Sequence, residues 1–135
     1  MLIAQDNNTA RMVNNLSWHF QTDRPIYLQL EDRIKLSILS GEFAPGEKLP
    51  AVRDMAVEAG VNPNTVQRSY ANLEREGLVF SQRTSGRFVT EDKMVIEKMK
   101  DEMAAKQIEL FLASMAAIGF SVDETLRLIS EKTRG

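Results

Sequence analysis

The side chains best suited to contacting a ligand lie close together, just after residue 62. Asn64, Thr65, Gln67 and Arg68 offer amide, hydroxyl and guanidinium groups. Such groups form hydrogen bonds with base edges and with phosphates. Ordinary solvent-exposed helix faces carry the same groups, so this cluster alone favours nucleic-acid binding and a plain polar surface equally.

Other kinds of site find little support in the sequence. The chain has no cysteine and a single histidine, His19, so a zinc site would need an uncommon set of carboxylates. His19 and the scattered carboxylates show no nucleophile–base arrangement. We therefore expect no catalytic residue, no metal and no cofactor, and we interpret Trp18 and His19 as packing residues.

Two short helices joined by a tight turn are predicted to position the polar cluster. Pro50 opens a helix at about 51–59, and Gly60 ends it because glycine adopts a left-handed conformation without steric cost. Asn62 and Pro63 then fit the N-cap and first position of another helix. A stop and restart this close together is typical of a helix-turn-helix.

The second of these helices is expected to end at Gly77. At 100° per residue, its polar side presents Asn64, Arg68 and Arg75, with Thr65 and Gln67 beside them. Its opposite side carries the predicted core residues Val66, Tyr70 and Leu73. Backbone N–H groups in its first turn can also hold a phosphate, as in a recognition helix.

A short hairpin after this helix favours DNA binding over a plain polar surface. Leu78–Phe80 and Phe88–Val89 are β-prone, and residues 82–87 are predicted to form the loop between them. Gly86 permits a tight turn, and Arg83 and Arg87 frame it. We interpret the hairpin as a wing whose arginines meet phosphates or the minor groove.

The charge balance limits this interpretation. The net charge is −2, and residues 21–90 contain as many carboxylates as basic side chains. DNA binding would therefore need a local positive surface, with the carboxylates turned away from Arg53, Arg68, Arg83 and Arg87. If carboxylates interleave these arginines, the alternative interpretation of a winged-helix protein–protein adaptor without DNA binding gains support.

The segment before residue 50 is predicted to be scaffold. A helix from Pro25 to Ser40 carries an apolar stripe at helical spacing, and Gly41 ends it. Trp18 to Phe20 are expected to form a short strand or a packing anchor, and residues 1–17 a polar extension. The stripe consists of Tyr27, Leu30, Ile34 and Ile38.

Residues 92–135 are expected to form a two-helix dimerisation tail. A long helix runs from Glu91 to Ile118, and Ser121 and Glu124 form a capping box for the last helix. Because two such helices bury little alone, a twofold dimer is the simplest partner. A Met-rich seam could also admit an apolar ligand, but packing is favoured. The predicted dimerisation residues are Ile108, Phe111, Leu112, Met115, Ile118, Leu126 and Ile129.

These elements predict a mostly α fold with one small β-hairpin. The domains are an N-terminal extension (1–17), a winged helix-turn-helix (18–91) and the helical tail (92–135). No apolar run approaches the roughly 20 residues that a membrane span needs, and no signal peptide is recognisable. The expected location is the cytoplasm.

The ordered motifs of residues 18–91 resemble the GntR family of bacterial transcription regulators, and the short tail is similar to its YtrA subfamily. The motifs that carry the resemblance are Arg24-Pro25-Ile26-Tyr27-x-Gln29, Gly41-x-x-x-Pro45-Gly46-x-x-Leu49-Pro50-x-x-Arg53, Asn62-Pro63-Asn64-Thr65-Val66-x-Arg68-x-Tyr70, Leu73-Glu74-x-Glu76-Gly77 and Ser85-Gly86-Arg87-Phe88-Val89.

The resemblance implies a homodimeric repressor of a pseudo-palindromic operator, often that of a neighbouring ABC-transporter operon. It also implies DNA contacts at Arg53, the start of the recognition helix and Gly86. Many relatives have arginine where this chain has Pro63 and Gln67, so the operator sequence does not carry over. An effector, where one exists, is expected at the tail or the domain junction. The expected DNA-binding residues are Arg53, Asn62, Asn64, Thr65, Gln67, Arg68, Arg83, Ser85, Gly86 and Arg87.

Overall fold

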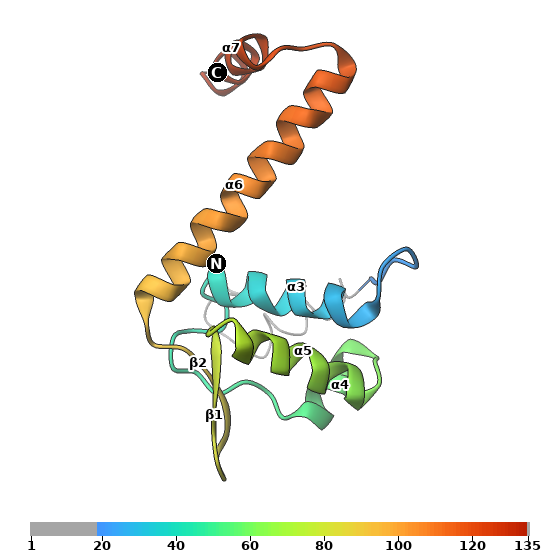
Figure 1. The fold of residues 1–135 in the computed structure, drawn as a ribbon, viewed down its shortest axis with the longest axis vertical. Coiled ribbons are helices and arrows are strands. Elements are labelled where there is room, and N and C mark those ends of the chain that lie inside the picture. Colours follow the sequence, from blue (N-terminus) through green and yellow to red (C-terminus); the bar gives the residue numbers. More distant parts are fainter. Residues whose placement is uncertain (1–18, 135) are drawn as a thin grey trace. The chain divides into compact units, whose positions relative to one another are not determined.

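The computed structural model describes residues 19–134, which form two compact units. The first unit ends at Glu97 and the second begins at Lys98, so the division falls inside a helix. Trp18 and the predicted extension at 1–17 lie outside the described residues, and His19 and Phe20 form no strand. The elements shown in Figure 1 are α3 (Ile26–Leu39), α4 (Val52–Ala59), α5 (Pro63–Arg75), β1 (Val79–Gln82), β2 (Gly86–Val89), α6 (Lys93–Ile118) and α7 (Val122–Thr133).

The core of the first unit lies where α3 and α4 pack against α5. The predicted apolar sides of α3 and α5 are confirmed, because their stripe residues are buried, with the exception of the half-buried Tyr27. Phe43, Leu49 and Leu78 come from connecting segments and complete the core. The buried stripe residues are Leu30, Ile34, Ile38, Val66, Tyr70 and Leu73.

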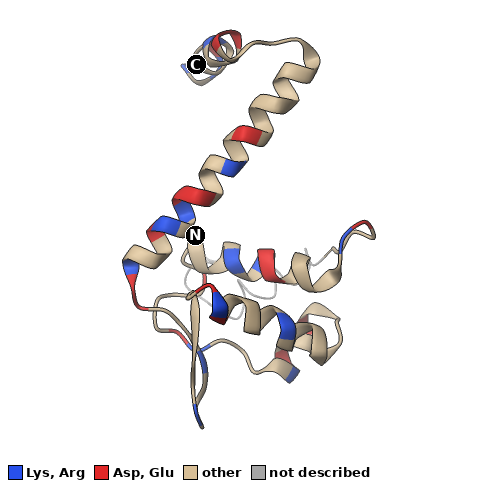
Figure 2. Ribbon diagram, in the orientation of Figure 1, with Lys and Arg blue, Asp and Glu red and all other residues tan. Residues whose placement is uncertain are grey.

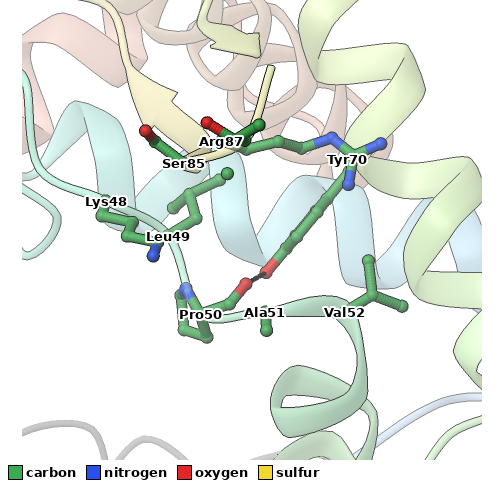
Figure 3. Close-up of a pocket in the computed structure, with 10 residues that line it drawn as sticks. Lys48, Leu49, Pro50, Ala51, Val52, Tyr70, Ser85 and Arg87 are labelled. Atoms are coloured by element: carbon green, nitrogen blue, oxygen red, sulfur yellow. Dashed lines mark hydrogen bonds between the residues drawn. The ribbon is translucent and has the colours of Figure 1, made fainter. Parts of the chain in front are cut away.

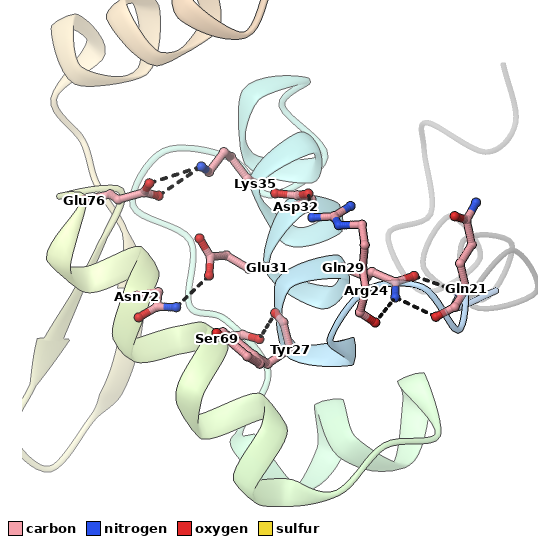
Figure 4. Close-up of polar contacts among 10 residues, drawn as sticks. All are labelled: Gln21, Arg24, Tyr27, Gln29, Glu31, Asp32, Lys35, Ser69, Asn72 and Glu76. Atoms are coloured by element: carbon pink, nitrogen blue, oxygen red, sulfur yellow. Dashed lines mark hydrogen bonds and ion pairs between the residues drawn. The ribbon is translucent and has the colours of Figure 1, made fainter. Parts of the chain in front are cut away.

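Polar contacts fix α5 against α3, as Figure 4 shows. The Ser69 hydroxyl donates to the carbonyl oxygen of Tyr27 at 2.7 Å. The Asn72 amide donates to the buried Glu31 carboxylate at 2.8 Å, which offsets the cost of removing that carboxylate from water. Because these contacts lie along the inner side of α5, its opposite side stays exposed.

The turn between α4 and α5 forms as the sequence predicts. Gly60 has a φ of 70° and ends α4, and its conformation is left-handed. The Asn62 side chain accepts a hydrogen bond from the Asn64 N–H at 2.7 Å, and Pro63 is the first residue of α5. Local capping chemistry therefore sets the point at which the second helix of the motif begins.

The hairpin is more regular than predicted. Gln82 pairs with Gly86, and Ser81 pairs with Arg87, so the predicted loop at 82–87 is wrong and the turn spans only residues 83–85. The chain before α4 supports the longer strand, because the Leu49 N–H donates to the Arg87 carbonyl oxygen at 2.8 Å. Lys48 forms a further bridge with Phe88.

The second unit contains most of α6 and all of α7. The predicted capping box is confirmed: the Glu124 N–H donates to the Ser121 hydroxyl at 3.1 Å, and the Ser121 N–H donates to the Glu124 carboxylate at 2.9 Å. Helix α6 begins at Lys93 rather than Glu91, since Asp92 accepts from the Met94 N–H just before its first turn.

Most of the apolar surface of the second unit is exposed in the single chain. No described residue of α6 is buried, and Thr125 is the buried residue of α7. Within residues 19–134, no single helix is long and apolar enough to cross a membrane; α6 and α7 reach that length and composition only as a pair, across a bend of 104°.

Candidate nucleic-acid interface

The first half of α5 presents most of the predicted base-contacting groups to solvent. Asn64, Gln67 and Arg68 are exposed, and Thr65 is half-buried. The side-chain oxygen of Asn62 is engaged as the helix cap, so its contribution is to fix the start of α5. The exposed amides and guanidinium can donate and accept at base edges in a major groove.

Arg68 has a second role that the sequence pattern did not reveal. Its guanidinium carbon lies 3.7 Å from the centroid of the Tyr27 ring, on α3. A guanidinium stacked on an aromatic face is held in one orientation while its N–H edges remain able to donate. Arg68 therefore joins α3 to the exposed side of α5.

Two of the predicted arginines, Arg53 and Arg83, contact no side-chain partner in the described part of the chain. Arg53 is the second residue of α4, Arg83 begins the hairpin turn, and both are exposed. In Figure 2, the blue of lysine and arginine marks both the start of α4 and the tip of the hairpin. Asp54 follows Arg53 directly, so the local positive surface includes a neighbouring carboxylate.

Arg87 makes contacts within the domain instead. Its Nε donates to Glu74 at 2.9 Å, and its guanidinium carbon lies 5.4 Å from the centroid of the Tyr70 ring. The Arg87 hydrogen bond, helped by one from Ser81, lowers the pKa of the Glu74 carboxyl below its ordinary value, so Glu74 is charged at neutral pH. The four predicted arginines thus fall into two groups. Arg68 and Arg87 are held by contacts within the domain, whereas Arg53 and Arg83 contact no other side chain in the described part of the chain.

A pocket of about 270 Å³ opens between the start of α4 and the wing (Figure 3). Pro50, Tyr70, Ser85 and Arg87 contribute to its lining. Lys48, which is not among the predicted DNA-binding residues, also lines it. Its side chain passes over Gly86, where an added Cβ would lie 2.9 Å from Lys48 Cε. A lysine at this position adds a positive charge beside the wing.

Comparison with known proteins shows the family to which the chain belongs. Residues 26–89 match the family described as "Bacterial regulatory proteins, gntR family". The HTH-type transcriptional regulator YhcF of Bacillus subtilis, itself uncharacterized, is 40% identical over 86% of this chain and 96% of its own length. The chain belongs to the GntR family. It is a transcriptional regulator with a winged-helix DNA-binding domain followed by C-terminal helices.

Other regulators and solved structures resemble the chain over most or part of its length. The HTH-type transcriptional repressor YtrA of B. subtilis is 32% identical over 82% of this chain and 86% of its own. A GntR regulator from Listeria monocytogenes is 33% identical, with a TM-score of 0.77 over 83% of this chain and 98% of its own. The DNA-binding domain of AraR, solved in complex with operator ORX1, is 27% identical, with a TM-score of 0.51 over 53% of this chain and 93% of its own.

Gly86 of this GntR wing is a position where the backbone requires glycine. Its φ is +114°, a conformation that other residues adopt only at a cost of about 1–3 kcal/mol. We expect Gly86→Ala to lower the free energy of unfolding of the winged helix by that amount, measured by thermal or denaturant unfolding.

Gly60→Ala is the matched control for this change. Gly60 is also left-handed, with a φ of +70°, but an added Cβ there would meet nothing within 4 Å. We expect it to cost about 1 kcal/mol, within the ordinary left-handed region. A Gly86→Ala protein as stable as the wild type would show that the wing relaxes to another backbone conformation.

Proposed function

We propose that this GntR regulator is a repressor that binds a pseudo-palindromic operator as a homodimer. The observation that carries the proposal is the exposed first half of α5, flanked by the free guanidinium groups of Arg53 and Arg83. The names of two relatives support it: YtrA is a repressor, and the AraR domain was solved on an operator.

In this proposal the recognition helix reads bases and the flanking residues hold the backbone. Asn64, Thr65, Gln67 and Arg68 face the major groove, while Arg53 and Arg83 meet phosphates. Ser85 and Gly86 bring the backbone of the wing close to the duplex. No part of this mechanism needs a reaction step, so we propose a binding protein rather than an enzyme.

The second unit supplies the dimer contact. Ile108, Phe111 and Ile118 of α6 are 57%, 45% and 71% exposed, and Leu126 and Ile129 of α7 are also exposed. Leu112 and Met115 are half-buried beside them. Exposure of this many large apolar side chains to water is unfavourable, and a twofold contact between copies would cover them.

A dimer would place its two recognition helices in successive major grooves, about 34–36 Å apart on one side of B-DNA. The proposed target is an operon for an ABC transporter, and the proposed site of action is the cytoplasm. An effector of unknown chemistry would act by changing the separation of the two recognition helices. A ligand that stabilises the protein without releasing DNA would count against that mechanism.

The test is a mobility shift of the full chain on its own promoter fragment and on a shuffled fragment of equal composition. We expect preferential binding to the promoter, with the logarithm of affinity falling linearly with the logarithm of salt concentration. Equal binding to both fragments would reject the operator proposal. No binding to either, at low salt, would favour the winged-helix adaptor.

A further inference from the structure

We propose that Glu74 and Arg87 form a positioning pair that holds the outer half of the wing against the recognition helix, so that Arg87 acts through Glu74 rather than as a DNA contact. The inference rests on the proposed function insofar as the wing is taken to contact DNA. Glu74 carries a negative charge among the elements proposed to face DNA, where charge complementarity alone would disfavour a carboxylate.

The two oxygens of the Glu74 carboxylate bind the two strands of the wing separately. Oε1 accepts from Arg87 Nε on β2 at 2.9 Å, and Oε2 accepts from the Ser81 hydroxyl on β1 at 2.8 Å. Ser81 and Arg87 are themselves cross-strand partners. One side chain in the last turns of α5 therefore holds both strands at the same level of the hairpin.

The outer half of the wing is held on the β2 side by the chain before α4, whose Leu49 N–H donates to the Arg87 carbonyl oxygen at 2.8 Å, so the contacts of Glu74 matter most for β1 and the tip. Leu78, Val79 and Val89 are buried and anchor the base of the hairpin. Beyond Phe80 and Phe88, whose rings stack, Ser81, Gln82 and Gly86 are exposed. A two-stranded hairpin is marginally stable by itself, so the side-chain contacts on Glu74 add to this backbone support in fixing where the tip lies.

The same chain of contacts reaches the start of α4. Arg87 lies over the Tyr70 ring, and the Tyr70 hydroxyl donates to the carbonyl oxygen of Pro50 at 2.8 Å (Figure 3). Tyr70 and Glu74 are one helical turn apart, so they occupy the same side of α5. The network thus joins the three elements expected on DNA: the start of α4, helix α5 and the wing.

The burial of the pair indicates which role Arg87 has. The side chains of Arg87 and Glu74 are 21% and 30% exposed, and their contact is charge-assisted. A phosphate would have to compete with a carboxylate already 2.9 Å from Nε. The exposed Arg83, at the tip that this pair positions, is the wing arginine available to DNA.

Glu74→Gln tests the proposal because the two possible roles of Glu74 predict opposite changes in operator affinity. If Glu74 only repels DNA, or only withholds Arg87 from it, its neutralisation strengthens operator binding. If Glu74 positions the wing, neutralisation weakens operator binding by about threefold to tenfold, because Arg83 no longer reaches its phosphate. The slope of the logarithm of affinity against the logarithm of salt concentration also becomes shallower by roughly one unit for each subunit of the dimer. Affinities are measured for the full chain on the promoter fragment over a series of salt concentrations.

Glu76→Gln is the matched control, since Glu76 also lies at the end of α5 but pairs with Lys35 on α3 at 3.1 Å. It removes the same charge without touching the wing, and we expect wild-type or slightly tighter binding. In an Arg83→Ala background, Glu74→Gln and Arg87→Ala are expected to cause no further loss. A further loss from Arg87→Ala in that background would make Arg87 a direct contact and overturn the proposal.

Amide hydrogen exchange of the protein without DNA is a second test that does not depend on DNA binding. We expect Glu74→Gln and Arg87→Ala to speed exchange in residues 80–88, and Glu76→Gln to leave it unchanged. Unchanged exchange in Glu74→Gln, or binding as tight as wild type, rejects the positioning pair while leaving DNA binding intact. Faster exchange in a protein that binds no DNA would keep the pair and reject the operator proposal.

Discussion

Replacing Phe111 with aspartate is expected to leave the regulator monomeric and to weaken operator binding by roughly a hundredfold or more. Phe111 belongs to the apolar seam of α6 and is 45% exposed in the single chain. In the proposed dimer it would be covered by the partner. A carboxylate there would be removed from water without a cation, which costs more than an apolar contact of this size returns.

The affinity falls so far because the second head of a dimer binds at high effective concentration. A monomer carries one recognition helix and loses that advantage entirely. Sedimentation velocity reports the oligomeric state, and a mobility shift reports the affinity. Ala113→Asp is the control, since Ala113 is exposed and lies on the opposite side of α6 from Phe111. A dimeric Phe111→Asp protein, or a monomeric Ala113→Asp protein, would show that the dimer uses another surface.

The helix-turn-helix was predictable because its signals are local. Gly60 ends α4 in a left-handed conformation, and Asn62 and Pro63 begin α5 through a cap and a fixed φ. Each signal acts within a few residues of itself, so no knowledge of the tertiary structure was needed. The capping box of Ser121 and Glu124 was predictable for the same reason.

The partners of the arginines were not predictable, because they depend on residues far away in the sequence. The position of Arg68 on α5 showed that it points outward, but not that Tyr27 lies beneath it. Arg87 was assigned to DNA from its place in the hairpin, whereas the fold brings Glu74 against it. A charge pattern gives the number of possible pairs, and only the packing of helices and strands decides which ones form.

The hairpin loop was predicted too long for a related reason. Gly86 has little strand propensity, and residues 82–87 separate the two β-prone runs, so Gln82 and Gly86 were both assigned to the loop. The chain before α4 runs alongside β2 and supplies backbone hydrogen bonds to it, including the bond from the Val89 N–H to the Glu47 carbonyl oxygen at 2.9 Å. This support extends the regular pairing toward the tip. It also brings Lys48 beside Gly86, which no periodicity in the sequence indicates.

Replacing both Arg53 and Arg68 with alanine is expected to abolish preferential binding to the operator. Each side chain should contribute on the order of 1–3 kcal/mol per contact, and a dimer has two copies of each. Arg53→Ala alone should weaken binding to all DNA sequences. It should also make the slope of the logarithm of affinity against the logarithm of salt concentration shallower by about one unit for each subunit, as expected for a lost phosphate contact. Because Arg53 is exposed and pairs with no side chain among residues 19–134, we expect no measurable change in stability.

Arg68→Ala should differ from Arg53→Ala in two measurable ways. It should lower discrimination between the promoter and the shuffled fragment, because Arg68 lies among the base-facing residues of α5. It should also lower the free energy of unfolding by about 0.5–1 kcal/mol, because the guanidinium leaves the Tyr27 ring. Arg75→Ala is the matched control, since Arg75 is exposed at the far end of the same helix and bonds to Asn72. If Arg75→Ala weakens binding as much as Arg68→Ala does, the first turns of α5 do not enter the groove, and the recognition surface must be placed elsewhere on the winged helix.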